Sequence, residues 1–311
     1  MVDLSLRIGS LTLSNPIMPA SGTFADGLAQ VIDFNRLGAF VTKTITAEKR
    51  SGNPVPRVAE VSNGMLNAIG IPSKGVDYFI ENVVPFYQDY TPPFIVSISA
   101  PSADEFASLA ARISAVPGVA GIEANISCPN IEEDGKAFAM LASSTAQVVA
   151  RLRRATDLPL WIKLTPNTGE IAAVAKAAEN EGADAIVVAN TILGMAIDIH
   201  TRKPKLGNVM GGMSGPAIKP IVVRMVYQCH RAVSIPVIGC GGISDANDVI
   251  EYMLAGARAV QVGTATFLRP TTMVDILNDL EAHCRKNGMT RLDDIVGTVV
   301  DDGFEPFEAM A

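Results

Sequence analysis

A thiol set between two amides marks the stretch best suited to chemistry, Asn125-Ile-Ser-Cys-Pro-Asn130. It closes the apolar run of residues 120–125, which is short enough for a buried parallel strand, and Pro129 removes a backbone donor where that strand should stop. Cys128 is therefore expected at the carboxyl end of a strand. A free cysteine is as readily a buried, inert thiol, so the spacing alone leaves both interpretations open.

Other polar or glycine residues also stand at the ends of predicted strands. From the second strand to the eighth they are Lys43, Ser97 with Ser99, Asn125, Lys163, Asn190, Gly241-Gly242 and Gly263-Thr264. In a closed parallel barrel these ends converge on one rim, where such barrels place their active sites. Bare backbone N–H groups at the two glycine-containing turns can approach phosphate oxygens, so this corner predicts a phosphate-bearing ligand.

The remaining requirements of such a ligand indicate a flavin. Lys163 is placed to stabilise the negative charge that appears on N1 and O2 of a reduced isoalloxazine ring. Lys43 adds a positive charge suited to a carboxylate. Amides supply both donors and acceptors for a small planar substrate with alternating carbonyl and N–H groups; the candidates are Asn67, Asn125, Asn130 and Asn190. A single asparagine is more commonly a turn or cap residue, but four on one rim favour a binding site.

The elements that must position these residues alternate between strand and helix. Eight strands are predicted at residues 15–20, 39–44, 94–98, 120–125, 158–163, 183–190, 235–239 and 259–263, with helical segments between them. This pattern predicts an α/β fold, a (β/α)8 TIM barrel forming one domain over residues 1–311. A short hairpin around Gly9-Ser10 opens the chain, and long insertions at residues 47–74 and 191–215 are read as a loop and an irregular segment. An open doubly wound sheet is the alternative, weakened by the lack of a G-x-G-x-x-G turn.

Composition excludes several classes of function. The formal net charge is −7, so no basic field attracts nucleic acid or anionic lipid. The four cysteines lie far apart without a C-x-x-C pair, which argues against a metal or iron-sulfur site within this chain; they are Cys128, Cys229, Cys240 and Cys284. No signal-like or membrane-spanning segment is present, and a reduced cytoplasmic setting is expected.

Several motifs in their order along the chain resemble the class 1 dihydroorotate dehydrogenases, and most closely the class 1B catalytic subunit. They include Ala20-Ser-Gly-Thr-Phe24, Asn63-Gly-Met-Leu-Asn-Ala-Ile-Gly70, Asn125-Ile-Ser-Cys-Pro-Asn130, Lys163-Leu-Thr-Pro-Asn167 and Gly212-Met-Ser-Gly-Pro-Ala-Ile-Lys-Pro220. The resemblance implies one FMN per chain, bound by Ser21, Lys43, Thr44, Asn125, Lys163, Gly215, Gly241, Gly242, Gly263 and Thr264. It implies that dihydroorotate, or the product orotate, meets Lys43, Asn67, Ala68, Ile69, Gly70, Ile71, Asn125, Asn130, Asn190 and Thr191.

The resemblance also implies a mechanism. Cys128 occupies the position of the family's catalytic base, which removes a proton from C5 of dihydroorotate while a hydride leaves C6 for the flavin. The loop at residues 131–138 is a candidate lid or an ordinary solvated loop. One departure is the run Ile71-Pro-Ser-Lys-Gly75, where the class usually has Leu-Gln-Asn-Pro-Gly, and it affects the detail of substrate contacts.

Class 1B enzymes pass electrons to a separate subunit that carries FAD and a 2Fe-2S cluster, and then to NAD. The resemblance therefore implies that partner, in a heterotetramer with two of each chain, and homodimerisation of this chain. The alternatives are a class 1A-type homodimer that uses fumarate, or a related flavin barrel acting on another pyrimidine. A dihydrouridine synthase-like reductase would need a basic RNA-binding face, and a phosphate-binding scaffold would lack activity.

Overall fold

Eight parallel strands form one sheet in the computed structural model, which describes residues 2–127 and 138–302. Their order is β3, β16, β15, β10, β9, β8, β7, β4, so from β4 to β16 each strand pairs with the next barrel strand along the chain, and β16 pairs with β3. The strands are β3 (Ile17–Pro19), β4 (Phe40–Val41), β7 (Phe94–Ile98), β8 (Val119–Asn125), β9 (Leu160–Lys163), β10 (Ala185–Val188), β15 (Val237–Gly239) and β16 (Ala257–Val262). The predicted TIM barrel is confirmed.

A close approach of backbone to backbone joins the two ends of this sheet. The N–H of Gly38, just before β4, donates to the carbonyl of Ile17 in β3 at 2.8 Å. A Cβ on Gly38 would lie 2.0 Å from the carbonyl oxygen of Asn15. Only glycine leaves room for this contact, so the residue type at position 38 determines how tightly the barrel closes.

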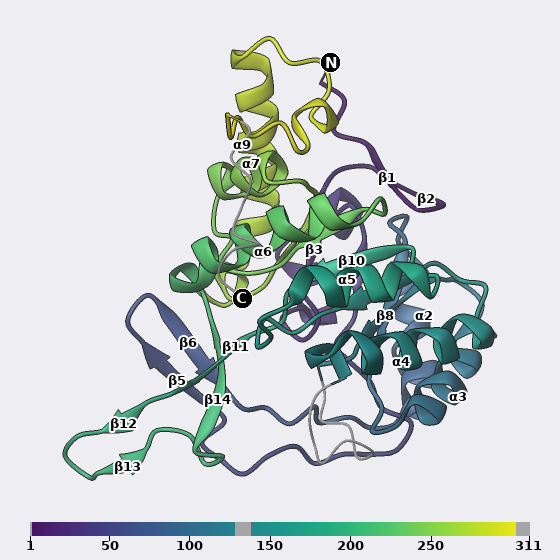
Figure 1. The fold of residues 1–311 in the computed structure, drawn as a ribbon, viewed down its shortest axis with the longest axis vertical. Coiled ribbons are helices and arrows are strands. Elements are labelled where there is room, and N and C mark those ends of the chain that lie inside the picture. The colour runs from purple at the N-terminus through teal and green to yellow at the C-terminus, as the bar shows by residue number, and fades with distance from the viewer. Residues whose placement is uncertain (1, 128–137, 303–311) are drawn as a thin grey trace.

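Helices cover the outside of the barrel between consecutive strands (Figure 1). Ser102 caps α3 by accepting from the N–H of Glu105, and Asp245 caps α7 through a capping box with Asp248; such caps contribute about 1 kcal/mol each. The α-helices are α1 (Val76–Asn82), α2 (Val84–Tyr87), α3 (Ala103–Ser114), α4 (Ala142–Ala155), α5 (Ile171–Asn180), α6 (Lys219–Ala232), α7 (Ala246–Leu254), α8 (Ala265–Leu268) and α9 (Thr272–Lys286). The 3-10 helices are η1 (Asp26–Gln30), η2 (Phe34–Arg36), η4 (Phe138–Met140), η5 (Pro216–Ile218) and η6 (Asp293–Ile295).

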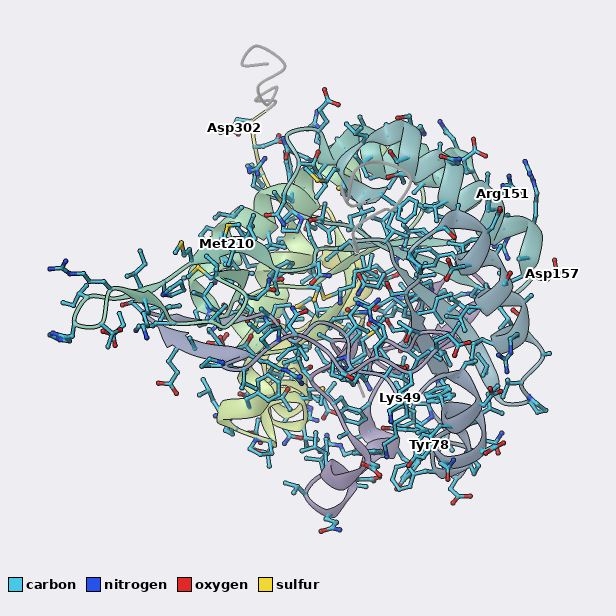
Figure 2. All side chains as sticks on the ribbon, turned by 90° about the horizontal axis from the view of Figure 1, so that it is seen from below. Lys49, Tyr78, Arg151, Asp157, Met210 and Asp302 are labelled. Carbon is cyan, nitrogen blue, oxygen red and sulfur yellow. The ribbon has the colours of Figure 1, made fainter. Side chains whose placement is uncertain are left out.

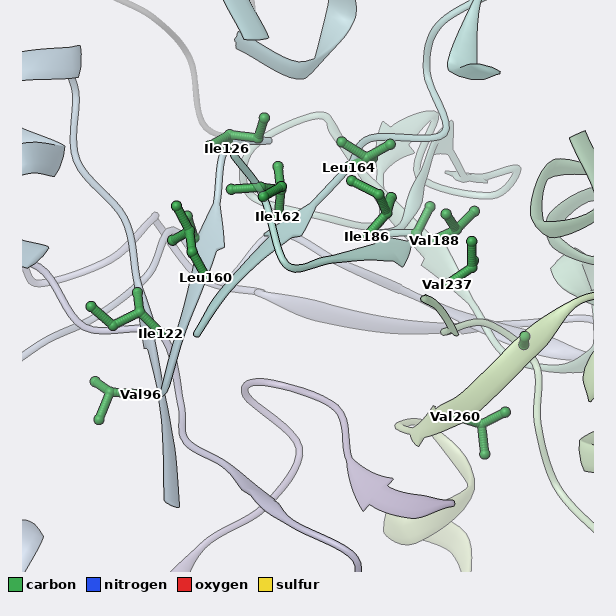
Figure 3. Close-up of a cluster of buried hydrophobic side chains, with 14 of the residues drawn as sticks. Val96, Ile122, Ile126, Leu160, Ile162, Leu164, Ile186, Val188, Val237 and Val260 are labelled. Atoms are coloured by element: carbon green, nitrogen blue, oxygen red, sulfur yellow. The ribbon is translucent and has the colours of Figure 1, made fainter. Parts of the chain in front are cut away.

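The strands are buried on both faces, and the two faces form different cores. Outward side chains such as Val96, Ile122 and Ile162 pack beneath the helices (Figure 3). Inward side chains such as Met18, Trp161 and Ile238 form a second cluster inside the barrel. The alternation follows from the period of two along a strand.

The hairpin predicted at the start of the chain is present and closes one end of the barrel. β1 (Leu6–Ile8) and β2 (Leu11–Leu13) pair antiparallel around Gly9-Ser10. Leu6, Ile8 and Leu13 belong to the same buried cluster as the inward side chains of the barrel. The hairpin therefore supplies an apolar floor.

The two long insertions form a second sheet, so their prediction as a loop and an irregular segment was wrong. β5 (Val58–Val61) and β6 (Gly64–Asn67) from the first insertion pair with β14 (Met210–Ser214) and β11 (Ile192–Met195) from the second. The strands pair across the chain and contain several glycines, which hides them from local patterns. β12 (Ile197–Asp198) and β13 (Lys203–Pro204) pair as a separate two-stranded sheet in an arm that projects from the barrel (Figures 1 and 2).

Across residues 2–127 and 138–302, none of the helices combines the length and the apolar character needed to cross a bilayer.

We expect Gly38→Ala to destabilise the protein by about 2–3 kcal/mol, because the added methyl group forces the backbone of Asn15 away and opens the β3–β4 seam. Chemical denaturation followed by circular dichroism measures this change. Gly27→Ala is the matched control, since no atom lies within 4 Å of a Cβ at that position, and it should alter stability by less than about 1 kcal/mol. Equal stability of the two variants would contradict this account of barrel closure.

Candidate active site

Lys163 lies at the end of β9 and points into the barrel, where it is almost fully buried. Its Nζ donates to Oε1 of Gln261 at 2.8 Å and to Oγ of Ser21 at 3.3 Å. Oε1 of Glu123 lies 3.9 Å from the same nitrogen. The predicted cofactor residues Ser21 and Lys163, from opposite halves of the chain, are therefore in contact.

Glu123 is the residue at the centre of the site that sequence reasoning missed. It is fully buried in β8, where Oε2 accepts from Nε2 of Gln261 at 2.5 Å and Oε1 accepts from Oγ of Ser97 at 3.1 Å. The signal was available, because a charged residue inside the apolar run of residues 120–125 must be paired when it is buried. Gln261 gave a similar signal within the apolar strand β16.

The hydrogen bonds continue from Ser97 to the predicted substrate residues. Ser97 and Thr44 share a hydrogen bond of 2.9 Å between their hydroxyl groups, and Nδ2 of Asn125 lies 3.5 Å from Oγ1 of Thr44. Nδ2 of Asn190 then donates to Oδ1 of Asn125 at 3.2 Å, and the N–H of Thr191 donates to Oδ1 of Asn190 at 2.8 Å. We call this connected set the rim network. Its members are Ser21, Thr44, Ser97, Glu123, Asn125, Lys163, Asn190, Thr191 and Gln261.

The glycine residues predicted for the phosphate corner also come together. A Cβ on Gly242 would lie 2.9 Å from the carbonyl oxygen of Gly215, and both residues have positive φ, +69° and +101°. Thr264 donates from Oγ1 to Oγ of Ser214, the neighbour of Gly215, at 2.8 Å.

The corner extends to α6 and to the turn after β3. Gly241 packs against Val222 of α6. Gly263 lies beside Ala20 and Thr23 without steric need for glycine, since the nearest atom to a Cβ there is 3.4 Å away. The N–H groups of Thr266 and Phe267 in α8 donate to the carbonyls of Gly263 and Thr264 at 3.0 and 3.1 Å, which fixes the turn between β16 and α8.

Asn67 and Lys43 approach the network from other directions. Nδ2 of Asn67 donates to the carbonyl of Gly212 at 3.3 Å, and Gly212 packs so closely on Thr191 that a Cβ would overlap its hydroxyl. The second sheet thus brings Asn67 towards the rim network. Lys43 is next to Thr44 with an exposed side chain, and partial desolvation by its surroundings lowers the pKa of its ammonium group.

Residues 68–71, which follow Asn67, are held by contacts with the 50–57 loop. The N–H of Ala68 donates to the carbonyl of Arg57, and the carbonyl of Ile69 accepts from the N–H of Asn53. Gly70 has a φ of +75°, and Ile71 has a φ of +47°, which is rare for a β-branched residue and marks local strain. The structure therefore ties residues 68–71 to the 50–57 loop, without a direct hydrogen bond to the rim network in the described part of the chain.

Cys128 and Asn130 lie outside the described residues, as does most of the candidate lid at residues 131–138. Ser127, the last residue described before that gap, has its N–H 3.4 Å from Oδ1 of Asn125. Phe138, the first residue after it, is buried in η4. The rim network thus reaches the residue that directly precedes Cys128.

The charge of Lys163 follows from its neighbours. Burial by itself disfavours the ammonium, but the carboxylate of Glu123 and a hydrogen bond with Cys240 outweigh that effect and raise the pKa of Lys163. Burial raises the pKa of the Cys240 thiol, so this group is a neutral partner at ordinary pH. Lys163 and Glu123 therefore form a buried ion pair inside the rim network.

Comparison with known proteins identifies relatives over nearly the whole chain. The model of the family described as dihydroorotate dehydrogenase matches residues 3–284. Proteins named dihydroorotate dehydrogenase B (NAD(+)), catalytic subunit, from Desulforamulus reducens and Pelobacter propionicus are each 46% identical, covering 95% and 96% of this chain and 98% of each relative. The protein of that name from Trichlorobacter lovleyi is 47% identical over 95% of this chain and 98% of its own length.

Proposed function

The chain belongs to the dihydroorotate dehydrogenase family, and on that premise we propose that it oxidises dihydroorotate to orotate in de novo pyrimidine (UMP) biosynthesis. We propose that it does so as the FMN-containing catalytic subunit of a class 1B enzyme, as one domain over residues 1–311 in the cytoplasm. The observation that carries this proposal is the rim network, which links cofactor candidates such as Lys163 to substrate candidates such as Asn190.

The residues at the rim fit FMN. The phosphate would lie at the corner formed by Gly215, Gly242 and Thr264, where backbone N–H groups are available at turns that exclude side chains. Lys163, fixed by Gln261 and Ser21, would hold a positive charge at the ring. FMN, when bound, supplies the acceptor for the hydride.

The chain's own residues bind the substrate and move the proton. Asn125 and Asn190 are already oriented by hydrogen bonds, so they would bind the ring of dihydroorotate at a small entropic cost. Asn67 and Asn130 would complete the amide set, and Lys43 would pair with the carboxylate. Cys128 would accept the proton from C5 as the C6–H bond breaks.

The segment of residues 68–71 would also line the substrate site. The positive φ at Gly70 and Ile71 turns this segment sharply after Asn67. Hydrogen bonds to Arg57 and Asn53 hold it in place, so it can form a wall without joining the rim network.

We expect Cys128→Ala to bind FMN and to slow flavin reduction by dihydroorotate by about 10²–10⁴-fold, because proton abstraction is lost. Anaerobic stopped-flow absorbance measures this rate. In the unaltered protein the rate should rise with pH through the ordinary range of a thiol, near about 8.5, since only the thiolate is a base. Cys284→Ala, which removes a buried thiol of α9, is the control and should react at the normal rate. Full-speed reduction in Cys128→Ala would exclude this cysteine as the base.

Electron transfer to NAD requires a second protein. Groups of three or more potential metal ligands are absent from the residues that the structure describes, and the relatives are named as catalytic subunits of NAD(+) enzymes. We propose that a partner with FAD and a 2Fe-2S cluster accepts the electrons, in an assembly of two copies of each chain.

The purified chain with FMN should therefore reduce an artificial dye with dihydroorotate as donor but should leave NAD unreduced. Anaerobic absorbance at the NADH band measures this, and adding the copurified partner should restore NAD reduction. NAD reduction by this chain alone would overturn the requirement for a partner, and rapid fumarate reduction would favour the class 1A alternative.

We propose that the projecting arm is a contact between two copies of this chain. Its exposed apolar residues form a continuous set along the arm: Leu193, Met195, Ile197, Ile199, Val209 and Met210. The tip carries Arg202, Lys203 and Lys205, whose charge is opposite to the net charge of −7 of the chain as a whole and favours approach of a second copy.

We expect Ile199→Asp, at a position that is 81% exposed, to shift the protein from dimer to monomer in sedimentation equilibrium. The introduced carboxylate would be desolvated on dimerisation without a partner of opposite charge. Val300→Asp is the matched control, because Val300 is 85% exposed but lies outside the arm. Dimers of unchanged affinity in Ile199→Asp would remove the arm from the interface.

A further inference from the structure

Glu123 joins two branches of the rim network through its two carboxylate oxygens. Oε2 accepts from Nε2 of Gln261, which turns the amide so that its oxygen faces Lys163. Oε1 accepts from Ser97, whose hydroxyl is bonded to Thr44 on the way to Asn125. One buried carboxylate therefore orients groups on the cofactor side and on the substrate side.

Among residues 2–127 and 138–302, few ionisable groups lie beside Lys163. β8 contributes Glu123, β15 is followed by Cys240, and β16 and the turn after β3 contribute the neutral partners Gln261 and Ser21. Since the thiol of Cys240 is neutral at ordinary pH, Glu123 is the anion that compensates the buried ammonium. A buried ammonium without such a partner tends to lose its proton.

We propose that Glu123 is a positioning residue that keeps Lys163 charged and aimed at the flavin, so that Lys163 balances the charge of the reduced ring without taking up a proton. The inference rests on the proposed function because it requires FMN at Lys163. Two electrons and one proton then convert the oxidised ring to a hydroquinone that is anionic at N1. If Lys163 were neutral before reduction, the same two electrons would bring two protons, the second to Lys163.

Glu123→Gln tests this directly because it keeps the shape and removes the charge. The new amide can accept from Gln261 through its oxygen and donate to Ser97 through its nitrogen, since a hydroxyl can also accept. The midpoint potential of bound FMN, measured with dithionite and redox dyes over a series of pH values, gives the number of protons per two electrons. We expect about one in the unaltered protein and about two in Glu123→Gln near neutral pH.

Ser97→Ala is the matched control. It removes a hydrogen bond to Glu123 but leaves the carboxylate, so it should keep about one proton per two electrons while weakening the alignment of Asn125. If Glu123 served only to pack the interior, the number of protons per two electrons would be the same in the unaltered protein, in Glu123→Gln and in Ser97→Ala. The same count in Glu123→Gln as in the unaltered protein would therefore overturn the inference.

A second measurement needs no bound flavin and compares the stabilities of two single variants with the stability of the double variant. In apo protein, Lys163→Met leaves Glu123 as an uncompensated buried anion, and Glu123→Gln leaves Lys163 unpaired, so each should unfold at a lower denaturant concentration. The double variant leaves neither charge alone and should be more stable than Lys163→Met. If the loss of stability in the double variant equals the sum of the losses in the two single variants, the inference would also be overturned.

The outcomes separate this inference from the proposed function. If the unaltered protein fails to bind FMN or to be reduced by dihydroorotate, the proposed function fails. If it binds FMN and is reduced by dihydroorotate, but Glu123→Gln takes up no additional proton, the function stands and the role of Glu123 fails.

Discussion

An ammonium group buried inside a β-barrel must be compensated within a few ångströms, because transfer of an isolated charge out of water costs many kcal/mol. In this protein Lys163 is compensated by Glu123, and Gln261 fills the space between them with hydrogen bonds to both. The three residues come from three strands, β9, β8 and β16. The ion pair and its hydrogen bonds to Gln261 therefore form only when these strands pair in the correct register and the barrel is closed.

The interior of the barrel is divided into an apolar end and a polar end. Inward residues such as Met18 and Trp161 pack on the N-terminal hairpin, which excludes water from below. The next inward positions towards the carboxyl ends are polar, with Ser97 in register with Glu123 and Asn125 in register with Lys163. Charges in such a dry setting interact more strongly than at a surface, which suits a site proposed to control the charge of a flavin.

The second sheet supplies a proposed substrate residue, Asn67, that does not come from a barrel strand. It carries Asn67 from one insertion to Gly212 of the other, and Gly212 rests on Thr191 at the edge of the rim network. Beyond β11 the second insertion continues outward into the arm, which carries exposed apolar residues. One structural addition thus serves the proposed substrate side and the proposed interface between copies.

Local patterns along the chain were enough to predict the barrel and most of the rim. Short apolar runs, the alternation of strand and helix, and a glycine-led hairpin are local features, and they predicted the eight barrel strands and the opening hairpin. The placement of Asn125, Lys163 and Asn190 at strand ends followed from the same local patterns, because parallel barrel strands share one rim; Ser21 and Thr44 were expected from the resemblance to the family.

The role of Glu123 and Gln261 and the existence of the second sheet depend on contacts between distant parts of the chain. Glu123 and Gln261 are 138 positions apart, and Asn67 reaches a carbonyl 145 positions away. Neither distance leaves a period or motif in the chain. A charged residue within an apolar strand predicts that a partner is present. The identity of that partner depends on strand register and barrel closure, which are set by packing across the whole fold.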